Sequence, residues 1–449
     1  MNILATVFLL VNAAAILLLP LRWAALPLLL GACYMTLGQG VELGPFNFPV
    51  IRILIAVGLA RVVLREERLA GGINGLDWLL LVWALWAAAS SLFHEDVSGT
   101  LLNRLGLVYN FCGIYFLLRV SCRSAGDVII LSRNTAILLI PLALSMLTER
   151  MTGLNPFSVF GGVDLYSQVR SGIVRAQGPF AHSILAGSVG ATSLPLMVVI
   201  WQRHRVIAIA GMAACITIVF ASASSGPILS TGASVAALAM WPWRGHMRIV
   251  RWLTALAYVG LELLMNAPAY YLLARIDLTG SSTGWHRAEL IDAAIRHFPE
   301  WGLAGTDYTR HWMSYGVPWS ANHIDITNYY INMGIYGGLP LMLLFIAMLA
   351  KGFAFVGQKT TKWIGSLPSS PSSFLMWALG SSLFAHTATF MSVSYFDQSV
   401  IFLYLTLAAI CAVRLRTASL FAGVSAENTS DSVRISPSRM NRQSADRLS

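Results

Sequence analysis

The chain has 449 residues, of which 56% are hydrophobic and 11% are charged, with a formal net charge of +10. Soluble globular domains carry about 25% charged residues, so this composition excludes an ordinary soluble protein. The mean hydropathy of +0.67 predicts an all-α fold, that of a polytopic membrane protein. The apolar runs do not alternate as the strands of a membrane barrel do.

Apolar runs long enough to cross a bilayer recur along the chain. A helix needs roughly 20 residues to cross about 30 Å of hydrocarbon. We expect spans near residues 3–19, 22–38, 49–65, 76–93, 101–120, 127–147, 182–201, 206–222, 227–243, 249–266, 326–350, 373–391 and 395–413. The total is thirteen spans, or twelve if the first two runs, which Pro20, Arg22 and Pro27 separate, form one span.

Basic residues predict which side of the membrane each loop occupies. Cytoplasmic loops carry an excess of Lys and Arg, and here alternate loops hold Arg22; Arg61, Arg65 and Arg68; Arg119 and Arg123; Arg203 and Arg205; Arg244, Arg248 and Arg251; Lys351, Lys359 and Lys362; and Arg414 and Arg416. The positive charge therefore indicates topology, and we expect no nucleic-acid partner.

This alternation divides the chain into membrane and loop segments. We expect membrane helices within residues 1–147, 182–266 and 326–413, and outer loops at 148–181 and 267–325. Residues 414–449 are rich in Ser, Arg and Asn and predict a disordered cytoplasmic tail.

The first long outer loop ends in Arg170-Ser-Gly-Ile-Val-Arg175-Ala-Gln-Gly-Pro-Phe-Ala-His182. The Gly-Pro pair predicts a tight turn that places Arg175 and His182 on either side of a bend. Arg170 and Arg175 are either phosphate ligands, which arginine binds bidentately, or solvated loop charges. Arg52 and Arg104, near outer span ends, either snorkel to the interface or face the bundle and hold an anionic headgroup.

The second long outer loop contains a predicted amphipathic helix at residues 285–298, which Ser281-Ser282-Thr283 can cap. Arg296 is expected to pair with Asp292 at the i,i+4 spacing. Arg287 lies three and four residues before the apolar Leu290 and Ile291, so it is expected to face the membrane domain. A buried arginine needs an anionic partner, and a diphosphate or a carboxylate would serve.

Glycines, aromatic residues and a histidine follow this helix. Gly302 and Gly305 permit close backbone approach, and the aromatic residues that come next suit a membrane interface or a sugar-stacking surface: Tyr308, Trp312, Tyr315 and Trp319. Asn322-His323-Ile-Asp325 stands at the mouth of the next span. His323 is therefore either a cap or a group that orients or deprotonates a substrate, with Asn322 and Asp325 in support.

We expect no metal and no cofactor, because the sequence contains no His or Cys cluster at metal-ligand spacing. A site for a divalent cation would also need clustered carboxylates, and the first two outer loops offer only Glu42, Glu95 and Asp96. We therefore expect arginines, and not a metal ion, to neutralise the charge of an anionic ligand.

In their order, these motifs resemble the O-antigen ligase and O-antigen polymerase superfamily. The resemblance rests on Arg175-x-x-Gly-Pro-Phe-x-His182, on Trp-His-Arg287 followed by Pro-x-x-Gly-x-x-Gly305, and on an Asn-His323 entry before a Gly-x-x-Gly span. It is best from Arg170 to Gly338. Many members carry Ser-Arg in the outer turn before the ninth span, where this chain has Ser222 to Pro227, so a third arginine must be Arg170, Arg52 or Arg104.

The resemblance implies an inverting, metal-independent glycosyl transfer on the outer face of the bacterial inner membrane. The donor would be a glycan on undecaprenyl diphosphate, and the acceptor a sugar hydroxyl on lipid A core or on a second lipid-linked repeat. Arg175 and Arg287 would hold the diphosphate, and His323 would act on the acceptor hydroxyl. A polymerase is slightly favoured over a ligase. A transporter or flippase of an anionic lipid-linked sugar, and a scaffold without catalysis, are the alternatives.

Overall fold

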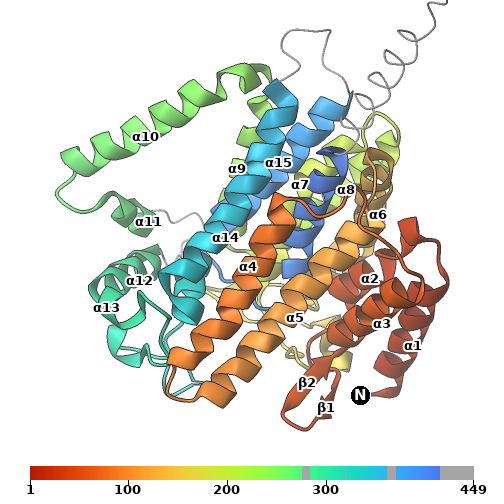
Figure 1. The fold of residues 1–449 in the computed structure, drawn as a ribbon, viewed down its shortest axis with the longest axis horizontal. Helices are drawn as coiled ribbons and strands as arrows, with labels where there is room; N and C mark the ends of the chain where they lie inside the picture. The colour runs from red at the N-terminus through yellow and green to blue at the C-terminus, as the bar shows by residue number, and fades with distance from the viewer. Residues whose placement is uncertain (276–283, 319, 362–370, 415–449) are drawn as a thin grey trace, which may run out of the picture.

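The structure is a computed structural model that describes residues 1–275, 284–318, 320–361 and 371–414. The predicted cap at 281–283, Trp319 and almost all of the predicted tail lie outside these ranges. The described chain is all-helical apart from two short hairpins (Figure 1). Its helices are α1 (Ile3–Leu18), α2 (Leu26–Tyr34), α3 (Val50–Leu64), α4 (Gly75–Ala89), α5 (Val97–Ser121), α6 (Ala125–Thr152), α7 (Ser183–Val199), α8 (Arg205–Ser222), α9 (Ser225–Ala239), α10 (Met247–Leu264), α11 (Leu272–Arg275), α12 (Gly284–Arg296), α13 (Phe298–Trp301), α14 (Tyr329–Thr361), α15 (Pro371–Thr389) and a final helix, Val400–Arg414.

Five helices are long and apolar enough to cross a membrane: Gly75–Phe93, Val97–Ser121, Ala125–Thr152, Arg205–Ser222 and Tyr329–Thr360. A sixth span would combine Trp241–Leu264 with Ala269–Arg275, which are bent by 93° at a short break. Five further apolar helices are shorter: Ile3–Leu18, Leu21–Tyr34, Ser183–Val199, Ser225–Ala239 and Val400–Arg414. Helix length and hydropathy thus support a multi-pass membrane protein, and thirteen spans stays a prediction.

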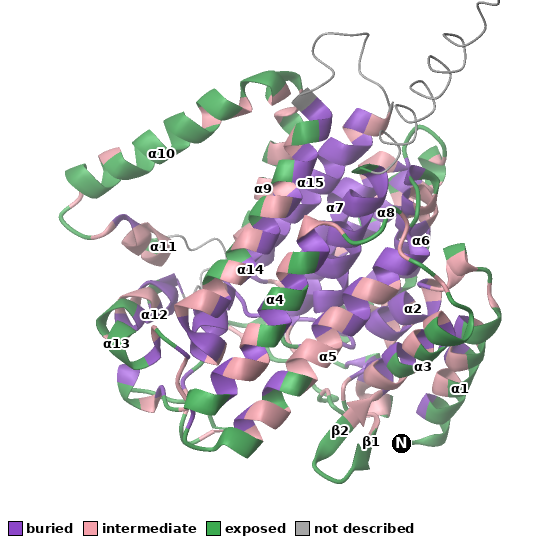
Figure 2. Ribbon diagram, viewed as in Figure 1, coloured by how far each residue is buried: buried purple, intermediate pink, exposed green. Residues whose placement is uncertain are grey.

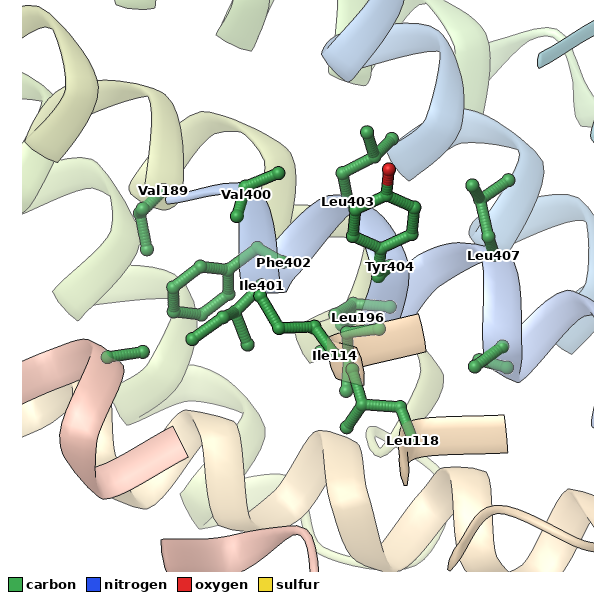
Figure 3. Close-up of a cluster of buried hydrophobic side chains, with 14 of the residues drawn as sticks. Ile114, Leu118, Val189, Leu196, Val400, Ile401, Phe402, Leu403, Tyr404 and Leu407 are labelled. Carbon is green, nitrogen blue, oxygen red and sulfur yellow. The ribbon is translucent and has the colours of Figure 1, made fainter. Parts of the chain in front are cut away.

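The final helix runs through the middle of the bundle. Every residue from Val400 to Val413 is buried, as expected for a helix that is apolar on all sides. Figure 3 shows its residues beside Ile114 and Leu118 of α5 and Val189 and Leu196 of α7. The last predicted span is therefore the central packing element, around which the other helices are arranged.

Helix α10 projects away from the bundle and has no buried residue (Figures 1 and 2). Large apolar side chains are exposed along it, among them Trp252, Leu256 and Leu263. Contact of these apolar side chains with water is unfavourable in free energy, whereas contact with lipid is not.

Loops that are far apart in sequence meet at one end of the bundle. The N-terminal Asn2 donates to the Val159 carbonyl at 2.7 Å, and His94, between α4 and α5, contacts Asp307 at 2.7 Å. A hairpin of β1 (Gly40–Leu43) and β2 (Phe46–Pro49) lies at the same end, with Gln39 bonded to the Phe160 carbonyl. This end contains both long loops that the sequence places outside.

Helix α14 is broken at Gly337 and Gly338, and the large loop docks against the break. Gly338 has φ +73°, and a Cβ there would lie 2.1 Å from the Leu303 carbonyl oxygen. The freed backbone groups find partners: Ile335 accepts from the Thr306 N–H at 3.1 Å, and Leu339 donates to the Gly302 carbonyl at 2.8 Å. Gly337 and Gly338 therefore allow the loop to pack closely against α14. Gly305, for which the sequence predicted a close approach, contributes from the loop side, since a Cβ there would lie 2.2 Å from the Ile335 carbonyl oxygen.

Candidate anion-binding site

A buried carboxylate fastens the loop that carries Arg170 and Arg175. Glu149, near the end of α6, is fully buried and accepts from the Gln177 N–H at 3.0 Å and the Gly178 N–H at 2.8 Å. Gly178 has φ +57°, which glycine adopts without strain. The Gln398 amide, in the loop between α15 and the final helix, donates to the Pro179 carbonyl at 2.8 Å. The predicted Gly-Pro turn is thus present, and it is held at a fixed position against the bundle.

Arg175 points into the protein and not into solvent. Its side chain is buried, and its Nη2 donates to the Ser224 hydroxyl at 2.7 Å. Ser224 follows Ala223, which has φ +44° in the turn between α8 and α9. The alternative in which Arg175 is a solvated loop charge is therefore wrong. A serine of the turn between α8 and α9 orients this arginine.

Helix α12 presents Arg287 to the same region. Leu290, Ala293 and Ala294 are buried and Ile291 is half-buried. Arg287 is buried beside them at 6% exposure, as its position before Leu290 and Ile291 predicts. Arg296, on the opposite face, is exposed and pairs with Asp292 at 3.2 Å. The helix ends at Arg296, two residues before the predicted end, because His297 is the N-cap of the separate helix α13.

Arg170, Arg175 and Arg287, the arginine cluster, lie close enough for their charges to interact. Burial, together with the charges of Arg170 and Arg287, lowers the pKa of Arg175 to about 10. Burial and Arg170 likewise lower the pKa of Arg287. The Nε atoms of Arg175 and Arg287 are buried and have no hydrogen-bond partner among the described residues. Like charges held together with unused donors form a site that an anion stabilises.

One carboxylate, Asp325, faces this cluster. Asp325 is exposed overall, yet the protein atoms around its carboxyl group raise its pKa, while the charges of His286 and Arg287 oppose that rise. His286, next to Arg287 in α12, contacts the Asp325 carbonyl oxygen through Nε2 at 3.1 Å and the Tyr315 hydroxyl through Nδ1 at 2.8 Å. His286 stands in the Trp-His-Arg motif, but the sequence pattern alone gave no signal for a role. It joins α12 to the entrance of α14.

His323 lies in a neighbouring group of polar residues. Its Nδ1 is 2.8 Å from the Ser320 hydroxyl, which leaves Nε2 available to a substrate. Burial lowers the pKa of His323, and the charge of Arg104 adds to this while Asp307 opposes it. Arg104 is buried in α5 and lies over the Tyr336 ring, 4.5 Å from its centroid. Arg104 therefore faces the bundle and does not snorkel to the interface.

The remaining candidate residues have local roles. His182 caps α7, because its Nδ1 accepts from the Ile184 N–H at 3.2 Å. Asn322 accepts bonds at its backbone oxygen from Thr309 and Arg310, at 2.9 and 3.0 Å, while its side chain is exposed. Arg52 bonds to Asn110 and to the Asn47 carbonyl instead of joining the cluster. Of the three candidates for a third arginine, Arg170 is the one beside Arg175 and Arg287.

Comparison with known proteins adds no assignment, since neither a protein-family model nor a curated protein matches the chain.

Proposed function

We propose that this chain is a multi-pass glycosyltransferase of the bacterial inner membrane that moves a glycan from undecaprenyl diphosphate to a sugar hydroxyl. The arginine cluster is the observation that supports this most strongly. Three cations, two of them buried with unused donors, suit a ligand with several negative charges, and Asp325 alone does not balance them. A diphosphate offers both the charge and the acceptor oxygens that arginine binds bidentately.

Each group then has a role in one displacement. The acceptor hydroxyl oxygen attacks the anomeric carbon, and the bond from that carbon to the diphosphate oxygen breaks with inversion. Arg175, Arg287 and Arg170 stabilise the negative charge that builds up on the departing diphosphate. His323 takes the proton of the acceptor hydroxyl, for which its lowered pKa keeps the imidazole neutral at pH 7. Asn322 and His182 support the backbone on either side of the site.

The acceptor determines whether the chain is a polymerase or a ligase. A second lipid-linked repeat would make it a polymerase of O-antigen or exopolysaccharide, which we favour slightly, and lipid A core would make it a ligase. The arginine cluster and His323 serve either acceptor, because both chemistries share the leaving group. A deletion strain separates them: loss of a polymerase leaves single repeats on the final acceptor, whereas loss of a ligase leaves long chains on the lipid carrier.

The topology belongs to the same proposal. Twelve or thirteen spans would place the loops at 148–181 and 267–325 on the periplasmic face, in contact with membrane lipids, and the C-terminus in the cytoplasm. The apolar helices and the gathering of those loops at one end of the bundle support this.

The full chain, purified in detergent, tests the activity with a lipid-linked glycan as donor. A transferase lengthens or transfers the glycan and releases undecaprenyl diphosphate in a single compartment. A transporter or flippase leaves the donor chemically unchanged in detergent, and that result would reject the proposal in favour of transport.

A further inference from the structure

Three side chains with metal-ligand atoms converge at the far end of α12. His297 Nδ1 lies 2.7 Å from Glu300 Oε1, and His311 Nε2 lies 2.9 Å from Glu300 Oε2. The three ligand atoms are all within 4.8 Å of one another. Within the ranges that the structure describes, this is the one group of three such residues.

The fold brings these residues together from two turns of chain. His297 and Glu300 stand three residues apart across the start of α13, so they share a face. His311 comes from the short helical turn Arg310–Trp312, which the chain reaches after reversing direction at Gly305, with φ +97°. His311 lies eleven residues beyond Glu300, so the sequence shows no cluster at metal-ligand spacing, and this reversal makes the two side chains neighbours.

Neighbouring aromatic rings hold the ligand side chains in place. His297 stacks on Trp312 with ring centroids 5.5 Å apart, and His311 stacks on Tyr308 at 5.1 Å. The Trp312 indole N–H donates to Glu300 Oε2 at 2.9 Å. Hydrogen bonds of this kind orient carboxylate ligands in metal sites, and side chains with fixed rotamers lower the entropic cost of binding an ion.

The exposure of the three side chains allows an ion to reach the site. The three side chains are 26%, 38% and 39% exposed, in the order His297, Glu300 and His311. Solvent can thus reach the site, and an ion can enter without unfolding the loop.

We propose that His297, Glu300 and His311 bind one divalent transition-metal ion, zinc by preference, with the remaining coordination position open to solvent. Two imidazoles and one carboxylate suit zinc and exclude calcium and magnesium, which take oxygen ligands. On binding, each imidazole carries its ring proton on the nitrogen that faces away from the ion. The hydrogen-bonded arrangement is the metal-free form of the same site.

The site is separate from the arginine cluster. His297 is ten residues beyond Arg287, which corresponds to about 15 Å along a helix axis, so the ion takes no part in the proposed glycosyl transfer. It would instead join α13 to the turn Arg310–Trp312. Thr309 and Arg310 bond to the Asn322 carbonyl, and the ion would thereby stabilise the segment that carries His323.

The test uses the full chain, purified through an affinity tag without histidines, treated with a chelator and titrated with zinc against a competing indicator. Cobalt titration in parallel reports coordination through its visible absorption. The variants are Glu300→Gln, His311→Ala and His297→Ala. His246→Ala, an exposed histidine in a distant turn, and Arg287→Ala, in the same helix, are the controls.

We expect one tight zinc ion per wild-type chain, and an affinity that falls at least about 100-fold in each of the three ligand variants. Both controls keep the wild-type affinity. Glu300→Gln preserves the size of the side chain, so a loss of affinity in this variant reports the missing carboxylate and not a loss of folding. Absence of zinc uptake by the wild type, or unchanged affinity in Glu300→Gln and His311→Ala, would overturn the proposal. Neither result depends on transferase activity.

Discussion

Arg175 and Arg287 are separated in the sequence by the five helices α7 to α11, yet their guanidinium groups lie close enough for the charge of Arg287 to lower the pKa of Arg175. Ser224 and the buried Glu149 hold one of them, and the packed face of α12 holds the other. The fold therefore maintains a repulsion between two buried cations. Such an arrangement costs stability unless an anion binds.

Removal of either arginine should greatly reduce glycosyl transfer while the protein still folds. We expect Arg175→Ala and Arg287→Ala to reduce kcat/KM by about 100- to 1,000-fold, the size of effect seen when a charge-stabilising donor is lost. Arg296→Ala is the matched control, because Arg296 is exposed and pairs with Asp292. Rates of donor consumption by the purified variants give the comparison, and equal loss in all three would argue against a specific site.

Ser224 should act through Arg175. Without its hydroxyl, the guanidinium loses its 2.7 Å hydrogen bond and its fixed orientation. A hydrogen bond to a charged group contributes about 1.5 to 3 kcal/mol, so Ser224→Ala should weaken donor binding by roughly 10- to 100-fold. Ser225→Ala, at the next position, is the control. Measured KM values for the donor distinguish the two, and an unchanged KM in Ser224→Ala would show that the bond is dispensable.

The pH profile should report His323. Its lowered pKa keeps the imidazole neutral below the ordinary value of about 6.5, so activity should fall only as the pH drops through that lowered value. Asp307→Asn removes a negative charge that raises the pKa, and the acid limb should move to lower pH. Arg104→Gln removes a positive charge that lowers it, and the limb should move to higher pH. Shifts in the same direction for both variants would contradict this assignment.

The contact between the large loop and broken α14 should be sensitive to a single methyl group. A Cβ at Gly305 would lie 2.2 Å from the Ile335 carbonyl oxygen, and the residue has φ +97°. We expect Gly305→Ala to reduce the free energy of unfolding by about 2 to 4 kcal/mol. Gly232→Ala, in α9 with open space around it, should be neutral or stabilising by up to about 1 kcal/mol. Unfolding in detergent measures both.

Local features were predictable because they depend on periodicity. The register of Arg287 with Leu290 indicated its burial, and the spacing of Arg296 and Asp292 indicated their ion pair. Gly302 and Gly305 likewise indicated a close backbone approach.

Long-range convergence was not predictable, because it depends on how the loops dock. The proximity of Arg170 to Arg287, the Ser224 contact and the union of His297 with His311 all arise from chain reversals that the sequence does not specify. The break in α14 was also not predictable, since the Gly-x-x-Gly pattern fits a continuous span equally well. Its position is fixed by the loop that bonds to the freed backbone groups.

Release of undecaprenyl diphosphate from a labelled lipid-linked glycan, catalysed by purified chain in detergent, examines the proposed chemistry and the arginine cluster together. We predict that wild type and Arg296→Ala release the diphosphate with its glycan transferred to an acceptor hydroxyl, while Arg287→Ala and His323→Ala are folded and nearly inactive. Full activity in folded Arg287→Ala and His323→Ala, or an intact donor with the wild type, would contradict the account.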